Sequence, residues 1–300
     1  MRILLAVDGS VSSDRAVELA ATLALPPDSL VRVVSVQQPY VDVLAMSWGS
    51  VGVSPDAMDS EEQAESRIHR EAIERAETAL ARPGLAVEGF LVRGRPATAV
   101  VEEAKGMTAD LVVVGSRGHS TIAAMVLGST AAEIVDHSPC PVLVARGSSL
   151  GAVAFADDGS DTARTAEKVL TDWPSFAGVP VTVVTVAETA VPVAGGFTPG
   201  LYDQVLASYS ESVDVAREEV REEADSEVQR LAQAGHRAEP VTLEGDAAGE
   251  ICRFATERGI GTIVMGTHGR TGLARMVLGS VARNVLLHAH CSVLIVRAAR

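Results

Sequence analysis

The sequence predicts two α/β domains in tandem, each a five-stranded parallel sheet flanked by helices. The first observation is an internal repeat: AVDGS at residues 6–10 is matched by ADDGS at residues 156–160, and corresponding segments stay 150 or 151 residues apart. The second is that short apolar runs alternate with segments of helical periodicity within each half. The third is composition, because the apolar residues are mostly Val, Ala and Leu with only 3% aromatic residues, as in parallel strands buried beneath helices.

The first elements follow from the N-terminal residues. Residues 3–7 form a continuous apolar run, ILLAV, which is typical of a strand buried on both faces. Residues 11–24 place their apolar side chains at spacings of three and four, which predicts an amphipathic helix packed on the sheet. A second apolar run at residues 30–36 predicts the next strand.

The rest of the first half continues the alternation. A charged helix is predicted over residues 59–81, since the Pro83-Gly84 pair that follows is a common stop signal for helices. A parallel crossover needs a helix, so the resulting βαβαβαβαβ order predicts a parallel sheet with helices on both faces. The remaining elements are a strand at 87–92, a helix at 97–105, a strand at 111–114, a helix from about 129 to 136 and a strand at 142–145.

The second half repeats this order. Its long acidic helix is predicted at residues 203–233, where Val220, Ala224 and Leu231 belong to an apolar series at helical spacing. The Glu and Arg residues between them are therefore expected on a solvated face of the helix.

The length also fits two domains, since 300 residues exceed what one compact core usually holds. We predict the domains at residues 1–147 and 148–300, joined near Gly147-Ser148-Ser149. No apolar run is long enough to cross a bilayer, and the start MRILLAVDGS lacks the basic region and cleavage site of a signal peptide. A soluble cytoplasmic protein is expected.

The charge of the chain limits its partners. A formal net charge of −14 opposes broad binding to nucleic acid or to an anionic membrane, because both are polyanions. Only two lysines occur, Lys105 and Lys168, and no GxxxxGK[ST] motif surrounds them, so a Walker-type phosphate loop is excluded. The three cysteines lack CxxC spacing and His288-Ala289-His290 is a weak metal motif, so we predict no metal site.

One pattern of glycines occurs once in each half. Residues 115–129 read GSRGHSTIAAMVLGS and residues 266–280 read GTHGRTGLARMVLGS, so both contain Gly-x-x-Gly, nine residues, and Gly-Ser. The first glycine ends the fourth predicted strand and the last begins the next helix, where backbone amides attract anions and glycine permits close approach. This glycine frame supplies the parts of a phosphate cradle. Turn geometry alone is the alternative, and Thr130-Ala-Ala-Glu133 could form a capping box without any ligand.

These segments resemble the universal stress protein family. The resemblance rests on AVDGS at the first strand, on the glycine frame and on SPCPVLVAR at residues 138–146, and it covers both halves, as in tandem members. It implies Rossmann-like domains of the adenine-nucleotide α-hydrolase-like type, with sheet order 3-2-1-4-5, and the glycine frame is the version of ATP-binding members. In an open parallel sheet, ligands bind where the strand order reverses, here between the first and fourth strands.

The nucleotide contacts of the family transfer to matching positions of this sequence. Asp8 and Asp158 match an aspartate beside the nucleotide, which could contact the adenine or ribose or hold Mg²⁺. One departure is Asp157, which stands where the family has an apolar residue. The candidates of the first half are Ala6, Asp8, Val36, Gly115, Ser116, Arg117, Gly118, His119, Ser120, Thr121, Gly128, Ser129 and Thr130. The candidates of the second half are Ala156, Asp158, Val186, Gly266, Thr267, His268, Gly269, Arg270, Thr271, Gly279, Ser280 and Val281.

The resemblance implies a protein that binds ATP with Mg²⁺ and acts as a nucleotide-dependent regulator of a stress response or growth arrest. No Ser-His-Asp set, nucleophile elbow or redox CxxC is present, so at most slow ATP hydrolysis or autophosphorylation is expected, and no catalytic residue is assigned. An adenylate-forming enzyme and a binder of cyclic AMP are the alternatives, although the SGGxDS loop of the former is absent.

Two further expectations concern the edges of the sheets and the glycines. The last strands, PVLVAR and SVLIVR, would leave unpaired backbone groups, so we expect them to pair with each other within the chain or in a homodimer. Alanine at Gly115 or Gly266 is expected to remove binding at one site while leaving the fold intact, because a Cβ would block the approach of the ligand.

Overall fold

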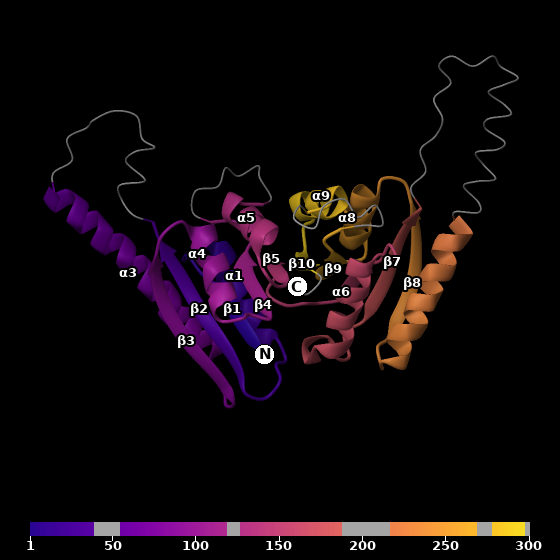
Figure 1. Ribbon diagram of the computed structural model, residues 1–300, viewed down its shortest axis with the longest axis horizontal. Coiled ribbons are helices and arrows are strands. Elements are labelled where there is room, and N and C mark those ends of the chain that lie inside the picture. The colour runs from indigo at the N-terminus through magenta and orange to yellow at the C-terminus, as the bar shows by residue number, and fades with distance from the viewer. Residues whose placement is uncertain (39–54, 119–126, 188–216, 269–277, 298–300) are drawn as a thin grey trace, which may run out of the picture. The chain divides into compact units, whose positions relative to one another are not determined.

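The computed structural model describes residues 1–38, 55–118, 127–187, 217–268 and 278–297 (Figure 1). The chain forms two compact units, one of residues 1–150 with 291–300 and one of residues 151–290. The last ten residues of the chain therefore belong to the first unit. The limits 1–147 and 148–300 remain predictions about the two repeats.

The first unit is built on a sheet with the strand order β3-β2-β1-β4-β5-β10. The first five strands along the chain are parallel neighbours in the predicted order 3-2-1-4-5. Within it, Leu5 of β1 lies opposite Val33 on one side and Val113 on the other, so the carboxyl ends of β1 and β4 are side by side. The strands are β1 (Arg2–Ala6), β2 (Ser29–Gln37), β3 (Leu85–Arg93), β4 (Leu111–Gly115), β5 (Val142–Ala145) and β10 (Ser292–Val296).

Helices cover this sheet as the alternation of the sequence predicts. The described helices are α1 (Val11–Thr22), α3 (Pro55–Leu80), α4 (Pro96–Gly106) and α5 (Ser129–His137). α1 contacts α3 and α4 contacts α5, as expected for helices on both faces of a parallel sheet. α3 begins one turn earlier than predicted, at Pro55, and proline is common at the first position of a helix. Ile3, Leu4 and Leu5 are 0% exposed, which confirms a strand buried on both faces.

A sixth strand corrects the predicted number of strands in the first unit. β10 pairs antiparallel with β5, with Val293 opposite Val144 and Ile295 opposite Val142. Five parallel strands would leave the backbone groups of β5 unpaired at an edge, and the fully buried β10 covers that edge. The expected pairing of the two last strands is thus confirmed within the chain, while a homodimer remains a prediction.

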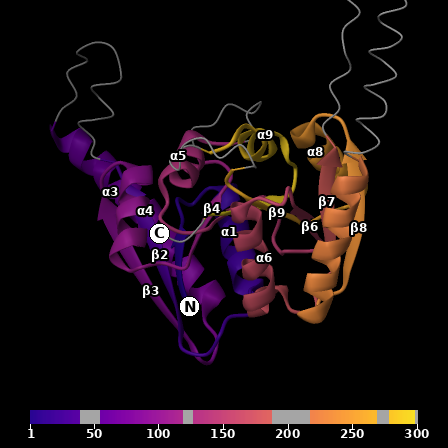
Figure 2. The same cartoon turned by 45° about the vertical axis from the view of Figure 1, so that its right-hand side comes forward.

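The second unit contains four parallel strands in the order β9-β6-β7-β8 (Figure 2). Five strands were predicted for the second half, but the fifth of them, β10, belongs to the first unit, where it pairs with β5. Its elements are β6 (Val153–Ala156), α6 (Asp161–Asp172), β7 (Val181–Ala187), a helix at 217–233, β8 (Ala238–Glu244), α8 (Ala247–Glu257), β9 (Thr262–Gly266) and α9 (Ser280–His288). The predicted helix start at residue 203 lies outside the described residues. A short 3-10 helix, η1 (Pro174–Phe176), was not predicted, and its buried Phe176 stacks on Trp173.

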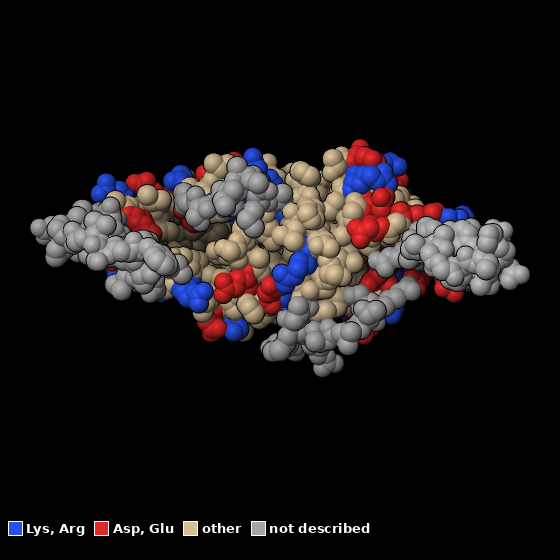
Figure 3. Space-filling view, turned by 90° about the horizontal axis from the view of Figure 1, so that it is seen from above, with Lys and Arg blue, Asp and Glu red and all other residues tan. Residues whose placement is uncertain are grey.

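One face of the molecule carries charged side chains of both signs (Figure 3). On the face seen in Figure 3, Asp and Glu side chains lie among Lys and Arg side chains. The described part of this face therefore carries no continuous basic surface of the kind that binds nucleic acid. Among the helices that the structure describes, none is long and apolar enough to cross a bilayer.

Candidate functional site

The carboxyl end of β1 continues into a tight turn at Asp8, Gly9 and Ser10. Oδ1 of Asp8 accepts a hydrogen bond from the Ser10 amide at 2.9 Å, and Gly9 adopts a φ of 81°, which favours glycine. Ser10 caps α1, since its Oγ accepts from the Ser13 amide at 3.2 Å, and the same hydroxyl donates to the Arg117 carbonyl at 3.3 Å. The turn therefore ties the end of β1 to the loop after β4.

The first glycine of each frame permits close packing of the protein on itself. An added Cβ at Gly115 would lie 2.6 Å from the carbonyl carbon of Ser12, in the first turn of α1. The equivalent Cβ at Gly266 would lie 2.8 Å from the carbonyl carbon of Thr162 in α6. Backbone atoms cannot rotate away as side chains do. Alanine at these positions therefore requires a shift of the backbone, which differs from the expectation that it acts on the ligand alone.

The other glycines of the first frame lie close to Asp8 and to each other. An added Cβ at Gly118 would lie 2.8 Å from Oδ2 of Asp8, so the carboxylate is directly against this glycine. The Gly128 amide donates to the Ser116 carbonyl at 2.7 Å, and a Cβ on Gly128 would lie 3.8 Å from the Gly118 amide nitrogen. The spacing of the frame thus brings both ends of the loop together near Asp8.

The helices that follow the two frames begin at glycines, which have no side chain to cap them. Gly128 and Gly279 are the N-cap residues of α5 and α9, and no side chain of the described residues forms a cap hydrogen bond at either helix start. Ser10 and Ser160, in contrast, cap α1 and α6. The capping box considered at Thr130 is not formed, because α5 already begins one residue before it. Uncapped amides at a helix N-terminus can bind an anion.

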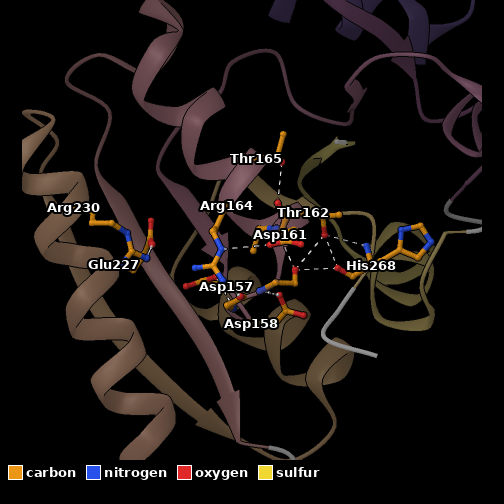
Figure 4. A network of polar contacts seen from close by, with 12 residues as sticks. Asp157, Asp158, Asp161, Thr162, Arg164, Thr165, Glu227, Arg230 and His268 are labelled. Atoms are coloured by element: carbon orange, nitrogen blue, oxygen red, sulfur yellow. Dashed lines mark hydrogen bonds and ion pairs between the residues drawn. The ribbon is translucent and has the colours of Figure 1, made fainter. Parts of the chain in front are cut away.

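Hydroxyl groups hold the second frame in place (Figure 4). Ser160 Oγ and Thr162 Oγ1 both donate to the His268 carbonyl, at 3.1 and 2.5 Å. The Gly279 amide donates to the Thr267 carbonyl at 2.8 Å, which closes the loop as in the first half. Nε2 of His268 is buried and has no hydrogen-bond partner within the described residues. A buried polar atom of this kind suits a ligand contact.

The comparisons with known proteins identify the family of the chain. The model of the universal stress protein family matches residues 1–146 and again residues 151–297. The chain belongs to this family. A universal stress protein of Mycolicibacterium smegmatis is 27% identical over 98% of this chain and 96% of its own length, and one of Thermus aquaticus is 36% identical over 48% of this chain and 97% of its own. The crystal structure of a universal stress protein from Archaeoglobus fulgidus, 16% identical, covers 99% of this chain and 98% of its own with a TM-score of 0.63, which shows the same fold.

The remaining candidates lie at strand ends and helix starts in both universal stress protein repeats. At or near strand ends are Ala6, Val36, Ser116 and Arg117 in the first repeat and Ala156, Val186, Thr267 and His268 in the second. The first turns of α5 and α9 hold Ser129, Thr130, Ser280 and Val281. Outside the described residues lie His119, Ser120, Thr121, Gly269, Arg270 and Thr271.

The second universal stress protein repeat differs at the residue before its site aspartate. Asp158 is exposed, and its Oδ1 accepts from the Ser160 amide at 3.1 Å, as the equivalent aspartate does in the first repeat. Asp157 is only 7% exposed, and its Oδ1 accepts from the Gly159 amide at 2.9 Å. Val7 holds this position in the first repeat. The second repeat therefore keeps the site aspartate and adds a buried carboxyl group.

Glu227 is the residue of this region that the sequence analysis missed. The acidic residues of its helix were expected on a solvated face, yet Glu227 is 1% exposed. It lies three residues after Ala224 and four before Leu231, so it belongs to the buried stripe, and that spacing could have revealed it. Oε2 of Glu227 contacts Arg230, whose Nε contacts Glu167 of α6 at 3.2 Å.

Proposed function

We propose that each universal stress protein repeat binds one ATP molecule and that the protein is a nucleotide-dependent regulator of a stress response or growth arrest. The observation that carries this proposal is the position of the Asp8 carboxylate against Gly118. Two neighbouring parallel strands thus present a carboxylate and a glycine loop at one point of the sheet. Ligands of open parallel sheets bind at such points.

Each part of this site suits a part of the nucleotide. The N-termini of α5 and α9, which begin at glycines, present amide groups that attract phosphate. Asp8 directs Oδ2 toward Gly118, where a carboxylate can accept a hydrogen bond from a ribose hydroxyl or the adenine amino group. In the second repeat, the buried Nε2 of His268 offers a further polar contact.

Mg²⁺ would enter this site with the triphosphate. The His, Cys, Asp and Glu side chains of the described residues form no group of three that could hold a metal ion. Phosphate oxygens and water would therefore supply most of its ligands, as is common for Mg²⁺. We expect at most slow hydrolysis or autophosphorylation, since fast hydrolysis needs a positioned base or water-orienting group beside the terminal phosphate.

The direct test is to identify the nucleotide that the purified protein carries. Denaturation followed by mass spectrometry should release one ATP per repeat. Released cyclic AMP would instead favour the binder of a cyclic nucleotide, and pyrophosphate formation with an added acid would favour an adenylating enzyme. If no nucleotide is released and ATP leaves the melting temperature unchanged, the proposed function is wrong.

Gly118→Ala should weaken ATP binding in the first repeat by roughly ten- to hundredfold and barely change stability. The added Cβ would lie 2.8 Å from Oδ2 of Asp8, so this flexible side chain must turn away. Loss of one hydrogen bond to a charged group costs about 1.5–3 kcal/mol. Isothermal titration calorimetry should then count a single strong site per chain.

Gly106→Ala is the matched control for this substitution. It lies in the same unit, and an added Cβ there meets no atom within 4 Å. We expect it to bind ATP in both repeats like the wild type. Equal ATP binding in Gly118→Ala and Gly106→Ala would contradict a role for the carboxylate that faces Gly118.

A further inference from the structure

Three largely buried carboxyl groups and an exposed arginine form a cluster next to the proposed nucleotide site of the second repeat (Figure 4). Arg230 contacts both Glu227 on its own helix and Glu167 on α6. The Glu227 side chain is 2% exposed, and its Oε1 has no hydrogen-bond partner within the described residues. Asp157 belongs to the same region at the end of β6. We call Asp157, Glu167, Glu227 and Arg230 the buried acid cluster.

The buried acid cluster contains more acid than base. If its three carboxyl groups were all ionised, Arg230 would balance only one of them, and a net negative charge would remain largely out of water. A carboxyl group in that position tends to keep its proton. Burial, followed by the charges of Asp157 and Glu167, raises the pKa of Glu227 to about 7, although Arg230 acts in the opposite direction. Glu227 therefore changes its charge near neutral pH.

Asp157 connects this cluster with the turn of the nucleotide site. Its amide donates to the Val184 carbonyl at 3.0 Å and its Oδ1 accepts from the Gly159 amide, so it is fixed at the base of the turn. Burial raises the pKa of Asp157, and the charges of Asp158 and Glu223 add to this effect. The negative charge of an anionic ligand bound beside Asp158 would likewise disfavour ionised carboxyl groups in the cluster.

The first repeat has no counterpart of the buried pair of acids. At the corresponding positions, 150 and 151 residues earlier, it has Val7 in place of Asp157 and Ala76 in place of Glu227. Val7 is 4% exposed and Ala76 is 0% exposed, so both are core residues. The buried pair of acids therefore distinguishes the second repeat from the first.

We propose that Glu227 takes up a proton when the second repeat binds an anionic nucleotide, so that this repeat binds its ligand more weakly as pH rises. This inference rests on the ATP binding proposed above. The phosphate charge adds to those of Asp157 and Glu167 and makes an ionised Glu227 costlier in the bound state than in the free state. Binding that takes up a proton is favoured by acid. The two repeats then respond differently to the acidity of their surroundings.

The test is calorimetric titration with ATP at about pH 6 and about pH 8, in a Gly118→Ala background in which the first repeat binds ATP more weakly and the second repeat is the strong site. We expect the affinity of the second repeat to fall roughly three- to tenfold over this interval, and Glu227→Gln to remove most of that fall. Glu227→Ala introduces the residue that the first repeat has at this position, and it should show the same weak pH dependence as Glu227→Gln. If one of the two variants fails to fold, the other still tests the proposal. Glu222→Gln, an exposed acid on the same helix, should keep the original pH dependence.

Proton uptake gives a second readout of the same coupling. Titrations near neutral pH in two buffers of different ionisation enthalpy should show that the protein with Glu227 takes up more protons than Glu227→Gln. Ionisation of ATP itself is common to all variants and cancels in this comparison. Equal pH dependence and equal proton uptake would overturn the coupling alone, whereas a lack of ATP binding in every variant at both pH values would overturn the proposed function with it.

Discussion

Glu227→Gln should stabilise the second unit at about pH 8 by up to roughly 3 kcal/mol and should have little effect at about pH 5. Glutamine keeps the shape of the buried side chain and cannot ionise. The wild-type protein, in contrast, must either hold a proton on Glu227 or bury an additional negative charge beside Asp157 and Glu167.

The direction of this effect follows from proton linkage. The pKa of Glu227 is raised from 4.5 to about 7 in the folded protein, so the unfolded chain releases this proton first as pH rises. Protonated Glu227 contributes its full share of the free energy of unfolding below pH 4.5, and this contribution is lost as the pH rises through about 7. At 1.36 kcal/mol per pH unit, the interval between these values amounts to roughly 3 kcal/mol.

Hydrogen exchange of the amides in the helix at 217–233 is the appropriate measurement, because it reports on the second unit separately. A single unfolding temperature would mix the transitions of two units. Glu222→Gln on the exposed face of the same helix is the control and should follow the wild type at both pH values. If protection in Glu227→Gln changed with pH in parallel with the wild type, Glu227 would not be the titrating group.

Much of the fold could be predicted from the sequence because the apolar pattern records it directly. Parallel strands buried on both faces are nearly continuous apolar runs, and residues 3–7 and 111–114 show this in the first half. The sequence also predicted that Asp8 lies near the glycine frame, because neighbouring parallel strands end at the same edge of the sheet. The structure places Oδ2 of Asp8 against Gly118, one of the frame positions.

The features that were missed depend on contacts between elements far apart in the sequence. Glu227 is buried because α6 and the end of β6 lie around it. In the sequence it was assigned to the solvated face because it is charged, although its helical spacing matches the buried residues. The place of β10 beside β5 likewise depends on an unpaired strand edge rather than on a local motif. Helix starts were ambiguous for a local reason, because both Gly128 and Thr130 resemble N-cap residues of α5.

Gly115 shows how a glycine can have a role that its motif does not suggest. Gly115→Ala should destabilise the first unit by about 1–3 kcal/mol, the usual cost of overpacking, rather than act on the ligand alone. The added Cβ would lie 2.6 Å from the carbonyl carbon and 2.7 Å from the carbonyl oxygen of Ser12. Either the start of α1 or the end of β4 must move. Hydrogen exchange of the amides in α1 should show the loss in the first unit, with Gly106→Ala as the control, because a Cβ there meets no atom within 4 Å.

A pair of double mutants separates packing from ligand contact at the two equivalent glycines. At Gly266 the added Cβ would lie 2.3 Å from Oγ1 and 2.8 Å from Cβ of Thr162, so part of the clash comes from a side chain. Thr162→Ala should therefore recover part of the stability lost in Gly266→Ala, whereas Ser12→Ala should recover none of that lost in Gly115→Ala, where the close atoms are backbone. If both glycine variants unfolded like the wild type and lost only ATP binding, the first glycine of the frame would serve the ligand and not the packing of α1 and α6.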